Sequence, residues 1–285
     1  MTATEKSSLE DLVQRARGGD DRALESLISA IQDRIYGLAV RMLADTEPAR
    51  DATQEILIKI VTNLAKFRGD STFGTWSYRV AVNHLLTLKA RKREQFLSFD
   101  VLGPVIDAGV APQPDEHPER ALLVKEMRVA CTQSMLLCLD RDHRLAYILG
   151  EILELDGVEA AAILELSPTA FRKRLSRARQ KLESFMQARC GVYDRTQSCR
   201  CDLQLSAGIQ QGLIDPQRLQ YARHPERGDT GDPHSAASPV DMTDDHREVE
   251  NLLSVAKVYR SHPDYASPRN FAAEIKDIIH GHGAS

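Results

Sequence analysis

The sequence predicts an all-α fold with two helical domains, a flexible linker between them and a partly helical C-terminal extension. Apolar residues recur every three or four positions through most of the first two hundred residues, which is the spacing of amphipathic helices. Aromatic residues make up only 5% of the chain, as suits an α-rich protein. The expected boundaries are residues 8–95, 96–121, 122–187 and 188–285.

The first expected domain, residues 8–95, reads as helical throughout. Helix breaks are predicted at Gly18-Gly19-Asp20 and at Thr46-Glu47-Pro48, with a loop from Phe67 to Thr72. After this loop, the segment from Phe73 to Arg93 reads as one helix that ends in a basic run.

The linker is predicted from a change in composition. Residues 98–120 hold four prolines and five acidic residues, with Arg120 as the one base. Such a stretch has little apolar surface to bury, so it is expected to stay without a packed core.

The second expected domain contains a helix-turn-helix pattern. Asp156-Gly157 signals a turn, a short helix follows from Val158 to Leu164, and Ser167-Pro168 supplies an N-cap and a first helical residue. The next helix has one apolar stripe and otherwise basic faces, and its stripe consists of Phe171, Leu175, Ala178 and Leu182. In such motifs the second helix lies in the major groove of DNA. Glu165 stands where these turns often have glycine.

The segment from Phe67 to Asn83 places aromatic residues beside Arg68, Arg79 and Asn83. Aromatic faces stack on unpaired bases, and Arg and Asn bind base edges and phosphates, so the segment suits single-stranded nucleic acid. A packing role explains Phe73 and Trp76 equally well.

Together with Asp51-Ala-Thr-Gln-Glu55, this segment resembles region two of the bacterial sigma-70 family, and most closely its extracytoplasmic-function (ECF) group. That group's pattern, F-R-G-[ED]-S-[ST]-F-x-T-W-L-Y-R-[IV]-A-x-N, is matched at nearly every position, with Ser77 as the visible departure. The helix-turn-helix resembles region four of the same family, although Ala170, Phe171 and Lys173 replace its usual Thr, Val and Ser.

The resemblance implies a sigma factor that binds core RNA polymerase and recognises the minus-35 and minus-10 promoter elements. The positions that match the family's docking surface for the clamp helices of the polymerase β′ subunit are Asp51, Gln54 and Glu55. The positions that match its contacts with melted minus-ten DNA include the loop that captures a flipped base, and they are Arg68, Asp70, Ser71, Thr72, Trp76, Arg79 and Asn83. The positions that match the helix reading duplex minus-35 DNA are Arg172, Lys173, Arg174 and Arg177. An anti-sigma factor is a further partner of such proteins.

Cys190, Cys199 and Cys201 lie within twelve residues of the extension. Three thiols can meet at one soft metal ion such as zinc, with a tail histidine as the fourth ligand. Incidental free thiols, or a reversible disulfide from Cys190 to Cys199 or Cys201, fit the spacing as well. Some ECF factors with a similar cysteine-containing extension respond to metals. Cys131 and Cys138, seven residues apart, are expected to be packed as small apolar side chains.

Composition bounds the remaining possibilities. The net charge of −4 falls on residues 203–285, so a local basic patch can still attract DNA. The chain has no long apolar run and no signal-peptide pattern, so a cytoplasmic protein without a membrane segment is expected. No enzyme motif is present. The alternative function is a one-component helix-turn-helix regulator with a metal- or redox-sensing tail.

Overall fold

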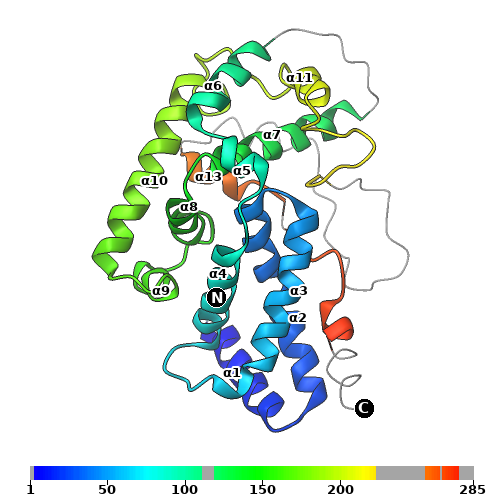
Figure 1. Cartoon of the computed structure of the whole chain (residues 1–285), viewed down its shortest axis with the longest axis vertical. Coiled ribbons are helices and arrows are strands. Elements are labelled where there is room, and N and C mark those ends of the chain that lie inside the picture. The colour runs from blue at the N-terminus through cyan, green and yellow to red at the C-terminus, as the bar shows by residue number, and fades with distance from the viewer. Residues whose placement is uncertain (1–2, 111–118, 223–253, 264, 276–285) are drawn as a thin grey trace. The chain divides into compact units, whose positions relative to one another are not determined.

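The computed structural model of the chain describes residues 3–110, 119–222, 254–263 and 265–275 (Figure 1). Within these residues all regular elements are helices, as the sequence predicts, and β-structure is limited to one isolated bridge between Cys190 and Cys199. The described residues form two compact units, one of residues 3–91, 140–178 and 265–275 and the other of residues 92–110, 119–139, 179–222 and 254–263.

The first unit begins with four helices: α1 (Ala3–Arg17), α2 (Asp21–Leu43), α3 (Thr46–Thr62) and α4 (Phe73–Thr87). A 3-10 turn, η1 (Leu64–Lys66), precedes the loop that leads into α4. Asp20 and Asp45 cap α2 and α3 by accepting backbone N–H bonds. These aspartates satisfy amides that the first helical turn leaves without partners. The break before α2 therefore falls where the sequence predicts it, whereas the break before α3 lies at Ala44 and Asp45, and the predicted Thr46-Glu47-Pro48 forms the first turn of α3.

The core of the four helices is aliphatic. The apolar stripe of α2 is buried almost completely, and α3 contributes Ile56, Leu57 and Ile60 to the same core. Arg144 is also buried, and its guanidinium donates to the backbone oxygen of Met42 at 2.6 Å. A buried charge is tolerated only with hydrogen-bonding partners, so this contact ties the second sequence block to α2.

The same unit contains α8 (Arg141–Tyr147), a π-helical turn η2 (Ile148–Ile152) and α9 (Gly157–Ile163). It also contains the first half of α10 (Pro168–Arg189), whose second half belongs to the other unit. Arg141 bridges to α4 by donating to the backbone oxygens of Leu85, Leu86 and Leu88 at 2.6–3.3 Å. Two blocks that the sequence assigns to separate domains therefore meet in one compact unit.

The second unit contains α5 (Lys92–Phe96), α6 (Phe99–Ala108), α7 (Arg120–Leu137), α11 (Leu205–Gln210) and α13 (Val255–Arg260). The predicted helix from Phe73 to Arg93 is thus wrong beyond Thr87, because Leu88 adopts an extended backbone and the chain restarts at Lys92.

The prediction of an unstructured linker is wrong for its first part. Phe99–Ala108 forms α6, which Ser98 caps and in which Leu102 and Ile106 are buried. The average composition of residues 98–120 conceals a helical apolar pattern in its first half. Most of the proline-rich second half lies outside the described residues.

Candidate nucleic-acid interface

The second helix of the predicted helix-turn-helix is α10, and most of its predicted DNA-binding residues are exposed. Phe171, Ala178 and Leu182 are buried, which fixes the apolar stripe against the protein. The opposite face carries Arg172, Lys173 and Arg177, all exposed, whereas Arg174 is half-buried. Arg174 pairs with Asp142 of α8 at 3.3 Å. Three of the four predicted DNA-reading side chains are therefore directly accessible.

The turn before α10 has the expected geometry. Ser167 accepts a hydrogen bond from the backbone N–H of Ala170 at 3.2 Å, as an N-cap does. Glu165 has a φ of 54°, the left-handed conformation that favours glycine. The chain nevertheless closes the turn, since the N–H of Leu166 donates to the oxygen of Ala161 at 2.9 Å.

The loop before α4 exposes Arg68, Gly69 and Asp70, while Ser71 and Thr72 are half-buried. Gly69 has a φ of 81°, which explains why the loop has glycine there. Thr72 caps α4 through the N–H of Thr75 at 3.2 Å. The exposed tip, rather than the capping residues, is the part of the loop that can reach a base.

The aromatic residues of this segment pack mainly against one another. Phe67 and Phe73 are buried, and their ring centroids lie 5.6 Å from each other and from that of Trp76. The packing interpretation is therefore the right one for Phe73. Trp76 keeps a half-buried position at the edge of the cluster.

The two polar residues expected to face melted DNA differ in environment. Asn83 is exposed on α4. Arg79 donates to the backbone oxygen of Ala162 at 3.1 Å and lies 3.9 Å from Glu165. Thr75 likewise donates to Glu159 at 3.0 Å. Arg79 is therefore engaged in contacts between α4 and the helix-turn-helix. The spacing of residues in the sequence does not indicate these contacts.

The predicted polymerase-docking residues lie on α3. Asp51 and Glu55 are exposed, whereas Gln54 is half-buried and donates to Glu274 at 3.4 Å. Arg50 donates to Asp51 at 3.1 Å, so that carboxylate is partly neutralised.

A buried histidine lies behind this surface and is not predicted from the sequence. The ammonium of Lys59 donates to Nδ1 of His84 at 2.6 Å, and Nε2 faces Glu55 at 3.7 Å. Burial lowers the pKa of His84, Lys59 lowers it further, and Glu55 opposes the shift. These shifts favour the neutral imidazole, whose Nδ1 accepts the hydrogen bond from Lys59.

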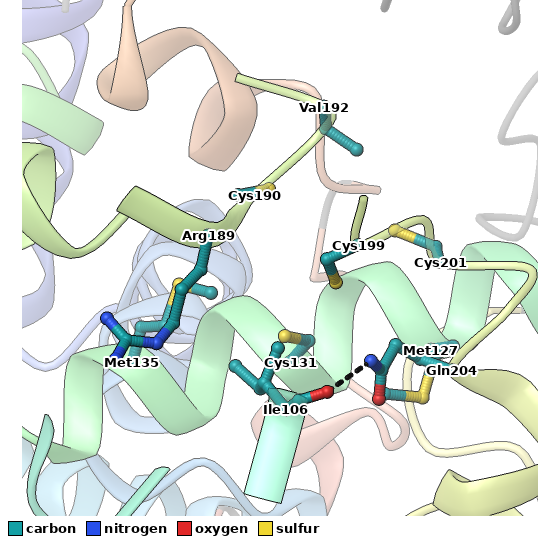
Figure 2. A pocket seen from close by; sticks show the side chains of 10 residues that line it. All are labelled: Ile106, Met127, Cys131, Met135, Arg189, Cys190, Val192, Cys199, Cys201 and Gln204. Atoms are coloured by element: carbon teal, nitrogen blue, oxygen red, sulfur yellow. Dashed lines mark hydrogen bonds between the residues drawn. The ribbon is translucent and has the colours of Figure 1, made fainter. Parts of the chain in front are cut away.

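The cysteines of the extension line one small cavity of the second unit (Figure 2). Cys190, Cys199 and Cys201 are joined there by Cys131 of α7, around a volume of about 20 Å³. Gln204 borders the cavity and donates to the oxygen of Ile106 at 2.7 Å. The cavity has room for about one water molecule. Cys131 is thus packed among apolar side chains, as the sequence predicts, and it also borders the cavity that the three cysteines of the extension line.

These thiols are neutral at physiological pH. Burial raises the pKa of Cys131 and Cys190, and it raises the pKa of Cys199 to about 11 and that of Cys201 to about 12. Nowhere among the described residues do three or more His, Cys, Asp or Glu side chains meet in a metal-binding arrangement. The three predicted ligands therefore share a cavity without forming a ligand set. Of the tail histidines, His262 is buried against Thr132 at 2.9 Å, and the others lie outside the described residues.

No helix in the described ranges is both long and apolar enough to cross a membrane.

Comparison with known proteins identifies both helical blocks. Residues 27–95 match the model of sigma-70 region 2, and residues 130–182 match that of sigma-70 region 4. The chain is 33% identical over 182 residues to the RNA polymerase sigma-H factor of Pseudomonas aeruginosa, covering 62% of this chain and 93% of that protein. It is 31% identical over 179 residues to the ECF RNA polymerase sigma-E factor of Escherichia coli, covering 62% and 93%.

A solved structure, that of CnrH in complex with the cytosolic domain of CnrY, has 24% identity and a TM-score of 0.47, and it covers 64% of this chain and 98% of that one. The matches to both sigma-70 regions, and the 31–33% identity to the sigma-H and sigma-E factors over 93% of each of those proteins, show that the chain belongs to the ECF group of the sigma-70 family of RNA polymerase sigma factors.

Proposed function

We propose that this ECF sigma factor delivers core RNA polymerase to promoters, reading duplex minus-35 DNA with α10 and melted minus-10 DNA with α4 and the loop before it. The observation that carries the proposal is the exposure of Arg172, Lys173 and Arg177 on one face of a helix whose opposite stripe is buried. A helix presented in this way fits the major groove, where Arg and Lys contact guanine edges and phosphates.

The second element of the proposal is the opening of the promoter. Arg68 and Asp70 lie at an exposed loop tip, and Asn83 is exposed on the following helix. Unpaired bases offer edges that duplex DNA conceals, so these groups are suited to hold a base that has left the stack. Ser71 and Thr72 contribute by shaping the loop, and Trp76 by closing the aromatic cluster behind it.

The third element is docking on the polymerase. The proposed docking surface lies on α3 and carries two carboxylates and one amide, from Asp51, Glu55 and Gln54. Its partner, as the family resemblance implies, is the pair of clamp helices of the polymerase β′ subunit. The protein acts in the cytoplasm, where it meets the polymerase. A separate anti-sigma factor remains a candidate partner, as the related sigma factors suggest.

The family is not an enzyme family, and the proposed activity requires no catalytic residue of the chain's own. A one-component regulator would need only the helix-turn-helix. That function does not explain why residues 27–95 match sigma-70 region 2, so this alternative is disfavoured.

The decisive experiment is transcription in a purified system. The full chain and core polymerase are combined with a library of duplex promoters, and transcripts that start at defined positions are expected only when both proteins are present. Core polymerase with Arg177→Ala protein is expected to yield fewer transcripts from the same promoters. Binding of duplex DNA without any polymerase-dependent transcript would support the regulator instead.

A further inference from the structure

The C-terminal strap, which we define as residues 265–275, packs on the helices of region 2 in the first unit. Phe271, Ala272 and Ile275 are fully buried, and Tyr265 is 8% exposed. Ala272 lies in a depression lined by the first half of α2, including Leu24 and Ile28. The segment is drawn in orange and red beside α2 and α3 in Figure 1. A chain segment that buries three apolar side chains completely is docked, rather than loosely attached.

Polar contacts fix the strap along α2. The N–H of Ser267 donates to Asp33 at 2.8 Å, and the N–H of Phe271 donates to the side-chain oxygen of Gln32 at 3.2 Å. These bonds satisfy backbone donors of the strap with side chains of α2, so they specify its position as well as its burial.

The first part of the strap is held by a further contact with α2. The guanidinium of Arg41 lies 4.6 Å above the ring of Tyr265, in a cation–π arrangement. Gly37, one turn earlier, leaves room for the Arg41 side chain, since a Cβ placed there would lie 2.9 Å from Nη1 of Arg41 and 3.8 Å, an ordinary contact distance, from the Cβ of Tyr265.

The end of the strap reaches the surface assigned to the polymerase. Glu274 accepts a hydrogen bond from Gln54, the middle residue of the docking set on α3, at 3.4 Å. Asp51 and Glu55 remain exposed beside it. A partner helix that binds all three residues competes with Glu274 for the side chain of Gln54, and so with the end of the strap.

We propose that the C-terminal strap is an internal competitor of core RNA polymerase for the docking residues on α3. This inference rests on the proposed polymerase-docking role of Asp51, Gln54 and Glu55. Only molecules with an undocked strap bind the polymerase at full strength, so the apparent affinity is reduced by the undocked fraction. Covalent linkage keeps the strap at a high effective concentration, which makes a weak contact an effective competitor.

A matched pair of variants in the full chain tests the proposal. Ala272→Asp places a charge at a fully buried position, and Ala273→Asp places the same charge at the next, exposed position. Binding to core polymerase is measured by fluorescence anisotropy. We expect Ala272→Asp to bind roughly tenfold more tightly than the wild type, and Ala273→Asp to bind as the wild type does. Equal affinity of all three proteins overturns the strap proposal, whereas the absence of binding by any of them overturns the polymerase-docking role itself.

A cross-link tests the same proposal in the opposite direction and does not depend on how Ala272→Asp folds. The Cβ separation at Gly37 and Tyr265 suits a disulfide, so the double variant Gly37→Cys and Tyr265→Cys is oxidised with diamide. The oxidised protein is expected to bind polymerase at least tenfold more weakly than after reduction with dithiothreitol. Tyr265→Cys alone, treated identically, is expected to show no redox dependence. Full polymerase binding by the cross-linked protein would overturn the proposal.

Discussion

At the scale of single residues, the recognition helix distinguishes two arginines that look equivalent in the sequence. Arg177 is exposed, whereas Arg174 pairs with Asp142 of α8 at 3.3 Å. An arginine already engaged in an ion pair must exchange one partner for another when it binds DNA, so its net contribution is smaller.

We therefore predict that Arg177→Ala weakens binding to duplex promoter DNA by about 1–3 kcal/mol, and that Arg174→Ala weakens it less. Gel-shift titration on matched and mismatched sites measures both changes. Lys257→Ala is the control, since it removes an exposed charge from α13, outside the recognition helix. A uniform loss on all sequences would assign Arg177 to phosphate contact, and no loss would contradict the groove assignment.

Among the residues proposed to contact melted DNA, Asn83 is an exposed polar side chain, whereas Trp76 packs against other aromatic rings. We predict that Asn83→Ala leaves closed-complex binding nearly unchanged but reduces promoter opening, measured by permanganate footprinting. A template with a pre-melted bubble is expected to restore activity, because the missing contact acts on unpaired bases. Thr87→Ala, exposed one turn further along α4, is the control. Failure of the bubble to rescue would indicate a role in polymerase docking.

Trp76 is a poor probe of base stacking, because its ring packs at 5.6 Å from those of Phe67 and Phe73. Its replacement by alanine is expected to destabilise the domain by about 3 kcal/mol, the usual effect of removing a packed aromatic ring.

The thiol cavity predicts a pH dependence of stability. The pKa of Cys201 is about 12 in the folded protein against 9.0 for an ordinary thiol, so the folded state holds this proton more tightly. The resulting stability is fully present below pH 9 and is lost as the pH rises toward 12. Denaturant unfolding from pH 8 to pH 10.5 is expected to show a shallower loss for Cys201→Ala than for wild type.

The matched control is Cys138→Ala, which alters the same helix-rich unit outside the cavity. It is expected to retain the wild-type slope of stability against pH. Equal slopes for all three proteins would show that the thiol of Cys201 is solvated in solution.

At the scale of secondary-structure elements, the extension is anchored to α7 by one carboxylate. Glu126 accepts backbone N–H bonds from Gln220, Tyr221 and Ala222 at 2.6–3.2 Å. A carboxylate has acceptor sites alone, which suits three donors that converge on it.

We predict that Glu126→Gln releases this part of the extension and lowers the free energy of unfolding by about 1–3 kcal/mol, since its amide group faces an N–H donor. Limited proteolysis is expected to cut near residue 222 faster than in wild type. Glu119→Gln, at an exposed position before the same helix, is the control. Unchanged cleavage would show that the anchor is dispensable.

At the scale of the whole molecule, charge distribution matters more than net charge. The chain carries a net charge of −4, yet three exposed cations cluster on one face of α10. A local patch of this kind releases counterions from DNA whatever the total charge of the protein.

We predict that duplex binding by the full chain falls with salt with a slope of about −3 in log–log form, as about three phosphate contacts require. Anisotropy titrations between low and moderate salt measure the slope. The double variant Arg172→Ala and Lys173→Ala is expected to reduce it by about 2. A slope near zero would exclude the α10 face as the DNA-binding surface.

The sequence by itself determined what neighbouring residues encode. The helix cap at Ser167, the helix break at Gly18-Gly19-Asp20, the apolar stripe of α10 and the positions of both family regions follow from short-range spacing. Helical periodicity and capping involve residues within a few positions of one another, so a linear pattern suffices to predict them.

Only the tertiary structure decided which distant residues meet. The hydrogen bonds from Gln54 to Glu274, from the amides near residue 221 to Glu126, and between Thr132 and His262 join residues 94 to 220 positions apart. The inclusion of Cys131 in the thiol cavity is of the same kind. No sequence periodicity relates such residues. They come into contact only when helices far apart in the sequence pack against each other, and this packing depends on the whole chain.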